Sequence, residues 1–255
     1  MDAILQVDLC LQEEYSIRSS ATKNHRRRVS VVIPAFNEET SIASVVNAIP
    51  RVLVSEIIVV NNGSTDRTVE AAATAGATVL TEPRKGYGHA CLKGIAFAVN
   101  TGADVLVFLD GDFSDYPEDL PDLLRPIEEE GFDMVIGSRM IGKREPGAML
   151  PQAIFGNWLA GVLIRLFWGY RFTDLGPFRA IRVDALQRMK MSDPTYGWTV
   201  EMQIKAAKLK LKCTEVPVRY RKRIGASKVT GTLSGTINAS VKILCTIFKY
   251  LFVKV

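Results

Sequence analysis

The sequence predicts an α/β fold in which a mostly parallel sheet is covered by helices on both faces. Two observations lead to this prediction: short apolar runs rich in Val and Ile alternate with amphipathic segments, and polar residues follow directly after several of the runs. Alternation at this spacing is typical of parallel sheets flanked by helices. Of the 255 residues, 47% are hydrophobic and 23% are charged, so the chain can bury a large core.

Five apolar runs are the predicted strands. Each is brief, and most are rich in β-branched residues and end at a Pro, Asn, Gly or Asp. They are Val29–Ile33, Glu56–Val60, Thr78–Leu80, Val105–Leu109 and Met134–Ile136. Amphipathic segments predict helices near residues 39–49, 65–76, 88–100 and 117–130. Ligands of such sheets bind at the carboxyl ends of the strands, so the residues after each run should carry the chemistry.

The two ends of the chain are expected to differ from this central domain. Residues 1–28 show no sustained period and contain a basic cluster, so we expect a flexible leader. Residues 29–232 should form the α/β domain, and residues 233–255 a C-terminal amphipathic helix. Another helix with an apolar face is expected at Phe155–Phe167. Such helices can cover the sheet, join copies of the chain in a homo-oligomer, or lie on an anionic membrane surface.

Charge and cysteine usage exclude several classes of protein. The 32 basic residues exceed the 27 acidic ones by a margin too small for a dedicated nucleic-acid binder, so no nucleic-acid partner is expected. No run reaches the ~18 apolar residues that a transmembrane helix needs. The four Cys residues form no CxxC pair, so the sequence indicates no zinc site or disulfide framework and favours a cytoplasmic location.

A pair of acidic residues follows the fourth predicted strand. Asp110 and Asp112 are separated by one glycine, and strand alternation points both carboxylates to the same side. Mg²⁺ or Mn²⁺ takes oxygen ligands and is commonly held by one or two carboxylates together with substrate phosphates. The pair therefore indicates a metal site for a nucleoside diphosphate. A solvated turn before a helix that begins near Pro117 is the alternative.

Polar loops after the second and third predicted strands also favour a nucleotide ligand. The segment Asn61–Asp66 combines a turn with a helix cap, and its polar groups suit hydrogen bonds to a base or ribose. The segment Arg84–Gly88 contains two cations and two glycines, which suits a phosphate passing close to the main chain. Both loops are expected at the same edge of the sheet as the aspartate pair.

Eight short motifs occur in an order and spacing that are specific when taken together. They are Pro34–Glu39, Asn61–Asp66, Lys85–Gly88, Asp110–Asp112, Gly137–Arg139, Asp174–Arg179, Gly197–Glu201 and Arg221–Lys228. In this arrangement, which covers roughly residues 29–230, the chain resembles the family 2 glycosyltransferases. Within that family it is most similar to the branch of dolichyl- and polyprenyl-phosphate sugar synthases.

The resemblance implies a GT-A fold, a nucleoside diphosphate sugar as donor, Mg²⁺ or Mn²⁺ as cofactor, and inversion at the anomeric carbon. The donor-binding residues that it implies are Pro34, Ala35, Glu38, Asn62, Asp66, Lys85, Asp110, Arg223 and Lys228. Asp110 and Asp112 would hold the metal, and Asp112 would be catalytic. The basic loop Arg221–Lys228 would order over the diphosphate when the donor binds; a solvated loop is the alternative.

The second half of the chain is expected to bind the acceptor. Arg139 and Arg179 offer the guanidinium fork that suits phosphate, which favours a polyprenyl or dolichyl phosphate. Such a phosphate needs no protein base, whereas a sugar hydroxyl must lose a proton. Asp174 and Glu201 are the base candidates for a hydroxyl acceptor. Their alternative roles are an ion-pair partner of Arg179 and a buried, hydrogen-bonded helix residue.

Three functions are therefore open at this point. The first is transfer of a sugar to a lipid phosphate by an enzyme peripheral to the cytoplasmic face of a membrane. The second is transfer to a soluble or glycan hydroxyl. The third is nucleotide binding without transferase activity, which requires the pocket but not the metal geometry.

Overall fold

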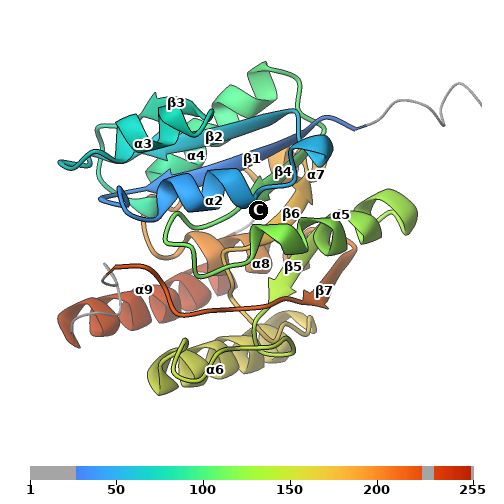
Figure 1. Ribbon diagram of the computed structural model, residues 1–255. Coiled ribbons are helices and arrows are strands. Elements are labelled where there is room, and N and C mark those ends of the chain that lie inside the picture. The colour runs from blue at the N-terminus through green and yellow to red at the C-terminus, as the bar shows by residue number, and fades with distance from the viewer. Residues whose placement is uncertain (1–26, 226–232, 254–255) are drawn as a thin grey trace, which may run out of the picture.

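A seven-stranded sheet forms the centre of the structure, a computed structural model that describes residues 27–225 and 233–253 (Figure 1). Its strands are β1 (Val29–Ala35), β2 (Glu56–Asn61), β3 (Thr78–Thr81), β4 (Val105–Phe108), β5 (Met134–Ser138), β6 (Arg179–Arg182) and β7 (Cys213–Pro217). They lie in the order β3-β2-β1-β4-β6-β5-β7, and β6 is antiparallel to its neighbours β4 and β5. The other pairs are parallel, so the predicted mostly parallel sheet is confirmed.

The sheet is buried on both faces because its strands send apolar side chains into two cores. In β1, Val32 packs into one core, whereas Val31 and Ile33 pack into the other. All four residues of β4 are buried. A fully buried aliphatic side chain of this kind contributes roughly 1.5–3 kcal/mol to the free energy of folding.

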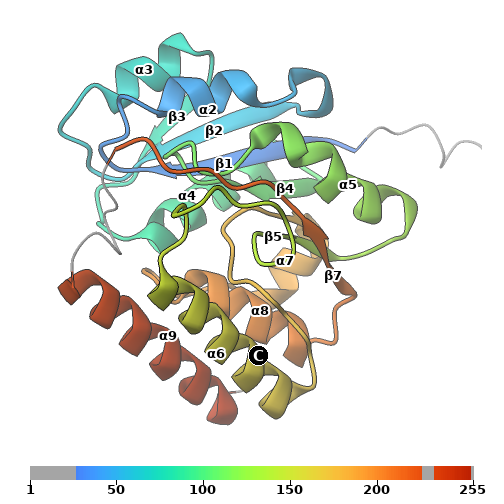
Figure 2. The ribbon, with the colours of Figure 1, turned by 60° about the horizontal axis from the view of Figure 1, so that its bottom comes forward.

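Helices cover both faces of this sheet. On one face lie α2 (Ile42–Ala48), α3 (Thr68–Thr74) and α5 (Leu120–Glu129). On the other lie α4 (Tyr87–Asn100), α7 (Val183–Met189) and α8 (Trp198–Lys208). Farther from the sheet, α6 (Pro151–Trp168) and α9 (Leu233–Phe252) pack against α8 and against each other (Figure 2). Two short 3-10 helices are η1 (Arg51–Leu53) and η2 (Pro117–Asp119).

The five predicted strands are confirmed to within two residues of their expected ends, but β6 and β7 were not predicted. The expected leader, residues 1–28, lies almost entirely outside the described residues, so the predicted domain boundaries stay predictions. Residues 233–252 do form a helix, α9. Across the part of the chain that the structure describes, no helix combines the length and the apolar character that crossing a bilayer requires.

The order of the strands positions the functional site. From β1 the chain continues to β2 and β3 on one side, then returns to the other side of β1 to form β4. The loops that follow β1 and β4 therefore diverge at the carboxyl edge of the sheet. A crevice at such a switch point, where the order of the strands reverses, is the usual ligand site of an α/β sheet.

Candidate active site

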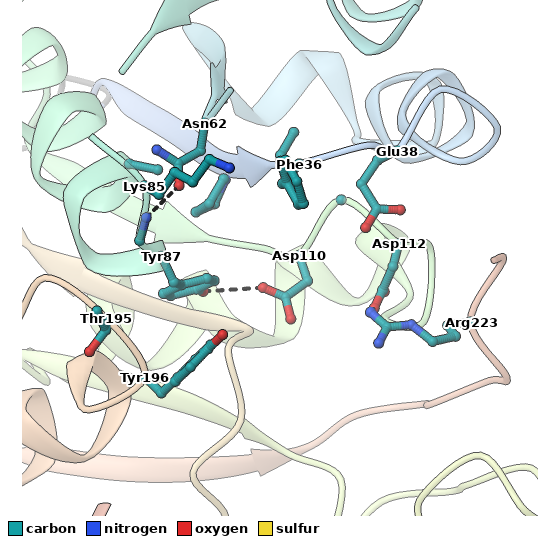
Figure 3. A pocket seen from close by; sticks show the side chains of 15 residues that line it. Phe36, Glu38, Asn62, Lys85, Tyr87, Asp110, Asp112, Thr195, Tyr196 and Arg223 are labelled. Atoms are coloured by element: carbon teal, nitrogen blue, oxygen red, sulfur yellow. Dashed lines mark hydrogen bonds and ion pairs between the residues drawn. The ribbon is translucent and has the colours of Figure 1, made fainter. Parts of the chain in front are cut away.

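A cavity of about 410 Å³ opens at this switch point, at the carboxyl ends of β1, β2 and β4 (Figure 3). Its lining residues are Pro34, Ala35, Phe36, Glu38, Asn62, Lys85, Gly86, Tyr87, Ala90, Asp110, Gly111, Asp112, Thr195, Tyr196 and Arg223. The structure thus brings together all of the predicted donor residues except Asp66, which lies elsewhere, and Lys228, which lies outside the described residues.

Asp110 stands shortly after β4 and lines the cavity. The Tyr87 hydroxyl, from the first turn of α4, donates a 3.1 Å hydrogen bond to Oδ1 of Asp110. Burial raises the pKa of Asp110 above its ordinary value, although the positive charge of Arg223 opposes this rise. A cation placed beside this carboxylate would favour its charged form.

Asp112 is buried, and the protein contacts both of its carboxylate oxygens. Oδ1 accepts hydrogen bonds from the backbone N–H of Ser114 (2.9 Å) and from its hydroxyl (2.6 Å). Oδ2 forms an ion pair with the Arg223 guanidinium. Figure 3 shows this guanidinium lying directly beside the Asp112 carboxylate. A ligand of Asp112 would therefore have to exchange with Arg223 at Oδ2.

The segment that carries Arg223 is tied to the aspartate loop along its length. The Ile224 N–H donates to the carbonyl of Asp112 (3.0 Å), and the Arg221 N–H donates to that of Ser114 (2.9 Å). The Arg221 guanidinium lies 3.5 Å from the centre of the Phe113 ring. We expected the loop Arg221–Lys228 to order when donor binds, but its described part, up to Gly225, is already held in place.

The other side of the cavity combines aromatic and polar groups. The Lys85 ammonium lies 5.9 Å from the centre of the exposed Phe36 ring. Glu38 is buried, and its carboxylate accepts a 3.0 Å hydrogen bond from the Ser41 hydroxyl. Asn62 holds the following loop: its amide donates to the carbonyl of Arg84 (2.8 Å), and its Oδ1 accepts from the Gly86 N–H (2.7 Å). These bonds make Asn62 a support of the cavity wall.

Gly86 and Gly88 allow the backbone at Asp193 and Pro194 to approach closely. A Cβ on Gly88 would lie 1.9 Å from the Asp193 carbonyl oxygen, and one on Gly86 would lie 2.2 Å from that of Pro194. The sequence had suggested a phosphate at this place. The close approach is instead made by the segment that continues into Thr195 and Tyr196, which line the cavity.

Asp66 organises a turn rather than the cavity. Its Oδ1 accepts a 3.0 Å hydrogen bond from the Thr68 N–H, and its Oδ2 accepts one of 3.2 Å from the Glu39 N–H. Burial alone would raise the pKa of Asp66, but these bonds and one from the Thr68 hydroxyl bring that pKa below its ordinary value. The turn holds the loop after β1 against the start of α3.

The two arginines predicted to bind the acceptor do not line the cavity. Arg139 forms a two-bond ion pair with Asp174, whose distances are 2.8 Å from Nε and 2.7 Å from Nη2. Arg179 is fully buried and donates to backbone carbonyls, including those of Leu175 and Thr199 at 3.1 Å each. Burial lowers the pKa of Arg179 to about 10. Arg179 therefore stabilises the core, and Asp174 pairs with Arg139 instead of with Arg179.

The two candidate bases also lie away from the cavity. Besides its bonds to Arg139, Asp174 accepts a 2.8 Å hydrogen bond from the Asn157 amide. Glu201 accepts bonds from the Tyr250 hydroxyl (2.6 Å) and from Lys205 (2.8 Å). Burial would raise the pKa of Glu201, but these donors and others lower it. Of the alternatives drawn from the sequence, the geometry favours the structural one for both carboxylates.

Asp115, which comes just before the helix expected near Pro117, is a further candidate. Its two carboxylate oxygens are buried and have no hydrogen-bond partner within the described part of the chain. Burial, with a contribution from the charge of Asp110, raises the pKa of Asp115 to about 7. The signal in the sequence was a third acidic residue after the same strand.

The carboxylates of the cavity suit a divalent cation that substrate phosphates also bind, rather than a metal site made of protein side chains alone. Among residues 27–225 and 233–253, no cluster of three or more His, Cys, Asp or Glu side chains is arranged to hold a metal. Asp110 and Asp112 offer two carboxylates in a cavity that also holds Arg223. Two carboxylates fit Mg²⁺ or Mn²⁺ when substrate phosphates complete the coordination.

Comparisons with known proteins identify the family. The model of the family described as glycosyl transferase family 2 matches residues 30–189. The chain belongs to glycosyltransferase family 2. An uncharacterized glycosyltransferase of Mycobacterium tuberculosis is 35% identical over 214 residues, which are 83% of this chain and 94% of the relative. An undecaprenyl-phosphate mannosyltransferase of Micrococcus luteus is 32% identical over 225 residues, 82% of this chain and 90% of the relative.

A solved structure has a similar fold. It is the glucosyl-3-phosphoglycerate synthase of Mycobacterium tuberculosis, crystallised with Mn²⁺, uridine diphosphate and phosphoglyceric acid. It has a TM-score of 0.72 and 25% identity, and the match covers 90% of this chain and 80% of that one. The GT-A-like fold and the similarity to polyprenyl-phosphate sugar synthases are therefore confirmed for this member of family 2.

Proposed function

We propose that this family 2 protein transfers a sugar, with inversion, from a nucleoside diphosphate sugar to a polyprenyl phosphate at the cytoplasmic face of a membrane. The observation that carries the proposal is the cavity at the switch point, where Asp110 and Asp112 occur together with Lys85 and Arg223. Paired carboxylates with nearby cations suit a diphosphate and a divalent cation. The three cysteines of the described residues are unpaired, which agrees with a reducing compartment.

Each group of the cavity has a proposed task in binding the donor. Phe36 and Tyr196 present exposed rings that suit stacking with a base or sugar. Lys85 and Arg223 would bind the diphosphate, and the Tyr87 hydroxyl orients Asp110. Asp110 and Asp112 would hold Mg²⁺ or Mn²⁺. When bound, such an ion neutralises the negative charge that develops on the departing diphosphate.

The proposed acceptor follows from the chemistry of the candidate bases. A lipid phosphate is already anionic at neutral pH and can attack without a protein base. Asp174 and Glu201 have both of their carboxylate oxygens in hydrogen bonds with other protein groups, which supports an acceptor that needs no base. The similarity to a mannosyltransferase named for undecaprenyl phosphate supports the same acceptor class. Of the two predicted acceptor arginines, Arg139 is the proposed phosphate contact, because its partner is a carboxylate that a phosphate could replace, whereas Arg179 is held by backbone carbonyls; Arg139 would have to exchange Asp174 for the phosphate.

A soluble phosphorylated acceptor is the second candidate. The similar synthase structure contains phosphoglyceric acid, which carries both a phosphate and a hydroxyl. A hydroxyl acceptor requires a base within hydrogen-bond reach. Asp115 does not line the cavity either, but it suits that task better than Asp174 or Glu201, because its oxygens have no partner in the described structure and its pKa is raised to about 7.

The test is a panel of nucleotide sugars with Mg²⁺ or Mn²⁺, assayed with polyprenyl phosphate and, in parallel, with phosphoglycerate. We expect turnover with the lipid phosphate and a loss of at least roughly 100-fold in Asp112→Asn, because metal-assisted stabilisation of the leaving group is worth several kcal/mol. Nucleotide affinity should change much less. Asp122→Asn, at an exposed position of α5, is the matched control and should retain turnover.

The outcomes separate the three functions. Turnover with phosphoglycerate alone would make the soluble acceptor correct. Nucleotide binding without turnover of any donor would support a binding protein. An Asp112→Asn variant as active as Asp122→Asn would overturn the proposed role of the aspartate pair.

A further inference from the structure

The helix α6 is apolar on the side that faces away from the core. Its inner side buries Asn157, Ala160, Gly161 and Ile164. Its outer side presents Phe155, Trp158, Val162 and Leu166, which are between 42% and 71% exposed. The outer residues recur at intervals of three and four and therefore form one stripe along the helix. A water-exposed helix normally carries polar residues there.

The helix α9 repeats this arrangement. Ala239, Ile247 and Tyr250 are buried. On the opposite side Ile237, Val241, Phe248 and Phe252 are between 48% and 87% exposed. Two outer helices of one molecule therefore present apolar stripes, whereas scattered single apolar residues are the usual state of a surface.

The two stripes lie next to each other. Figure 2 shows α6 and α9 side by side and running in the same direction. The rings of Phe167 in α6 and Phe248 in α9 are in edge contact, with centroids 6.2 Å apart. We call the combined surface the α6–α9 face; it consists of Phe155, Trp158, Val162, Leu166, Ile237, Val241, Phe248 and Phe252.

The charged residues of α6 and α9 themselves, Arg165, Lys242 and Lys249, are all basic, and Lys242 is paired with Asp193. The sequence contains no acidic residue between Glu145 and Asp174, and none after Glu215. Within α6 and α9, Arg165 and Lys249 are exposed. A second copy of the chain docked on the same face would bring like charges together, because symmetric dimers pair the same patch with itself. An anionic lipid surface is complementary to both the apolar stripe and the cations.

We propose that the α6–α9 face is the surface by which this protein docks on an anionic lipid bilayer. The proposal goes beyond the transfer reaction, because docking requires neither donor nor metal. It also fits the proposed acceptor. Arg139 comes before α6 along the chain and Arg223 comes before α9, so each docking helix follows a segment that carries a cation. Ile141, between Arg139 and α6, is likewise exposed.

Vesicle binding of the full chain tests the proposal. The protein is sedimented with vesicles of phosphatidylglycerol and phosphatidylcholine, and with vesicles of phosphatidylcholine alone. We expect binding to the anionic vesicles and a loss of at least tenfold in the partition coefficient for Leu166→Glu/Val241→Glu. Val52→Glu, at a 76% exposed apolar position of η1, is the matched control and should bind as the parent does.

The emission of Trp158 provides a second measurement on the parent protein. Trp158 is exposed, whereas Trp198 is buried in the core and Trp168 is half-buried against Phe167, so transfer into lipid should shift mainly the emission of Trp158 to shorter wavelength. Trp158→Phe should lose most of the shift and still sediment with the vesicles. This measurement does not depend on whether the glutamate variants fold, which circular dichroism checks.

Three results would overturn the proposal. The parent could remain in solution with anionic vesicles, or bind neutral vesicles equally well. Light scattering could instead show a dimer that Leu166→Glu/Val241→Glu dissociates, which would make a second copy the occupant. Turnover with a water-soluble, short-chain polyprenyl phosphate is measured in parallel. Turnover without vesicle binding would overturn only the docking role of the α6–α9 face. Vesicle binding without turnover would overturn only the proposed transferase function.

Discussion

The ion pair between Arg223 and Asp112 lies inside the cavity and links the proposed diphosphate contact to the proposed metal site. A guanidinium binds phosphate and carboxylate with the same planar fork, so Arg223 can exchange Asp112 for a diphosphate without losing its charge-assisted bonds. The exchange would free one oxygen of Asp112 for a cation. Donor and metal should therefore bind together.

We predict that Arg223→Ala weakens binding of nucleoside diphosphate in the presence of Mg²⁺ by roughly 10- to 100-fold, because a hydrogen bond to a charged group is worth about 1.5–3 kcal/mol. Arg223→Lys should fall between this variant and the parent, since it keeps the charge but loses the fork. Isothermal titration calorimetry measures the affinities. Arg182→Ala, which removes a surface pair with Asp184, is the control. Equal affinities for all variants would contradict a diphosphate contact at Arg223.

A second prediction concerns the buried carboxyl of Asp115. Its pKa in the folded state is about 7, against an ordinary value of 3.8. Since folding favours the protonated form, this group stabilises the fold below about pH 4, and the stability is lost as the pH rises towards 7. A shift of this size corresponds to a loss of up to about 4 kcal/mol. Because the side chain of Asp115→Asn cannot ionise, this variant should not lose stability in this way as the pH rises.

Urea unfolding of the parent and of Asp115→Asn between pH 5 and pH 8 measures this effect. The free energy of unfolding of the variant should increase relative to that of the parent as the pH rises, and most of this increase should be complete above pH 7. Parallel pH dependences would show that Asp115 is already ionised and stabilised in the fold.

At the scale of elements, the start of α4 is shaped by the irregular segment Asp193–Tyr196 that crosses it. Gly88 lies where the carbonyl of Asp193 makes its close approach, and the backbone next to Asp193 carries Thr195 and Tyr196 into the cavity. The His89 N–H adds a 3.2 Å hydrogen bond to the carbonyl of Pro194. This contact joins the two halves of the site.

We therefore predict that Gly88→Ala destabilises the protein by about 1–3 kcal/mol, because its Cβ meets backbone atoms that cannot rotate away. It should also weaken donor binding, because Thr195 and Tyr196 move with the displaced segment. Gly156→Ala is the matched control within α6: nothing lies within 4 Å of its new Cβ, and a helical Gly→Ala change stabilises by roughly 0.5–1 kcal/mol. Thermal unfolding and nucleotide titration of both variants measure the contrast. If Gly88→Ala behaves as the control does, the contact does not shape the site.

The elements that could be predicted from the sequence are those whose burial is indicated by local composition. The first five strands are mostly continuous apolar runs, and polar residues that follow four of them line the cavity. The strand β6 begins and ends with arginine, and Arg179 is buried there because the carbonyls of Leu175, Gly176 and the more distant Thr199 accept its hydrogen bonds. The edge strand β7 is only partly buried and contains Thr214 and Glu215. Their place in the sheet depends on long-range contacts that no local pattern records.

The same limit applies to the predicted site residues. That most of the expected donor residues line one cavity could be predicted, because they follow parallel strands whose ends meet at one edge of the sheet; their role in donor binding stays a prediction. Arg139, Asp174 and Glu201 belong to motifs of the second half, where the chain crosses back through β6. Whether such a residue faces the cavity or the core is set by its three-dimensional partners. Asp174 has Arg139 and Asn157 as partners, and neither lies nearby in the sequence.

At the scale of the whole molecule, Glu201 connects the outer helix α9 to the central domain. The carboxylate accepts a 2.6 Å hydrogen bond from Tyr250 of α9 and pairs at 2.8 Å with Lys205 one turn farther along α8. Its second oxygen accepts from the Asp193 N–H at 2.7 Å, in the segment that leads to the cavity. One buried carboxylate thus joins the proposed docking helix, the helix beneath it and the wall of the site.

The last prediction separates this structural role of Glu201 from a catalytic one. Glu201→Gln should lower the free energy of unfolding by about 3–5 kcal/mol, because it leaves the buried Lys205 without its charged partner. Tyr250→Phe should lower it by about 1–3 kcal/mol, since it removes one hydrogen bond to a charged acceptor. The exposed Glu128→Gln on α5 is the control and should change little. Turnover per folded molecule, measured with the preferred nucleotide sugar, should stay within a few-fold of the parent in all three. A loss of roughly 100-fold or more in Glu201→Gln without a loss of stability would instead make Glu201 a catalytic base, and the hydroxyl acceptor would then replace the lipid phosphate.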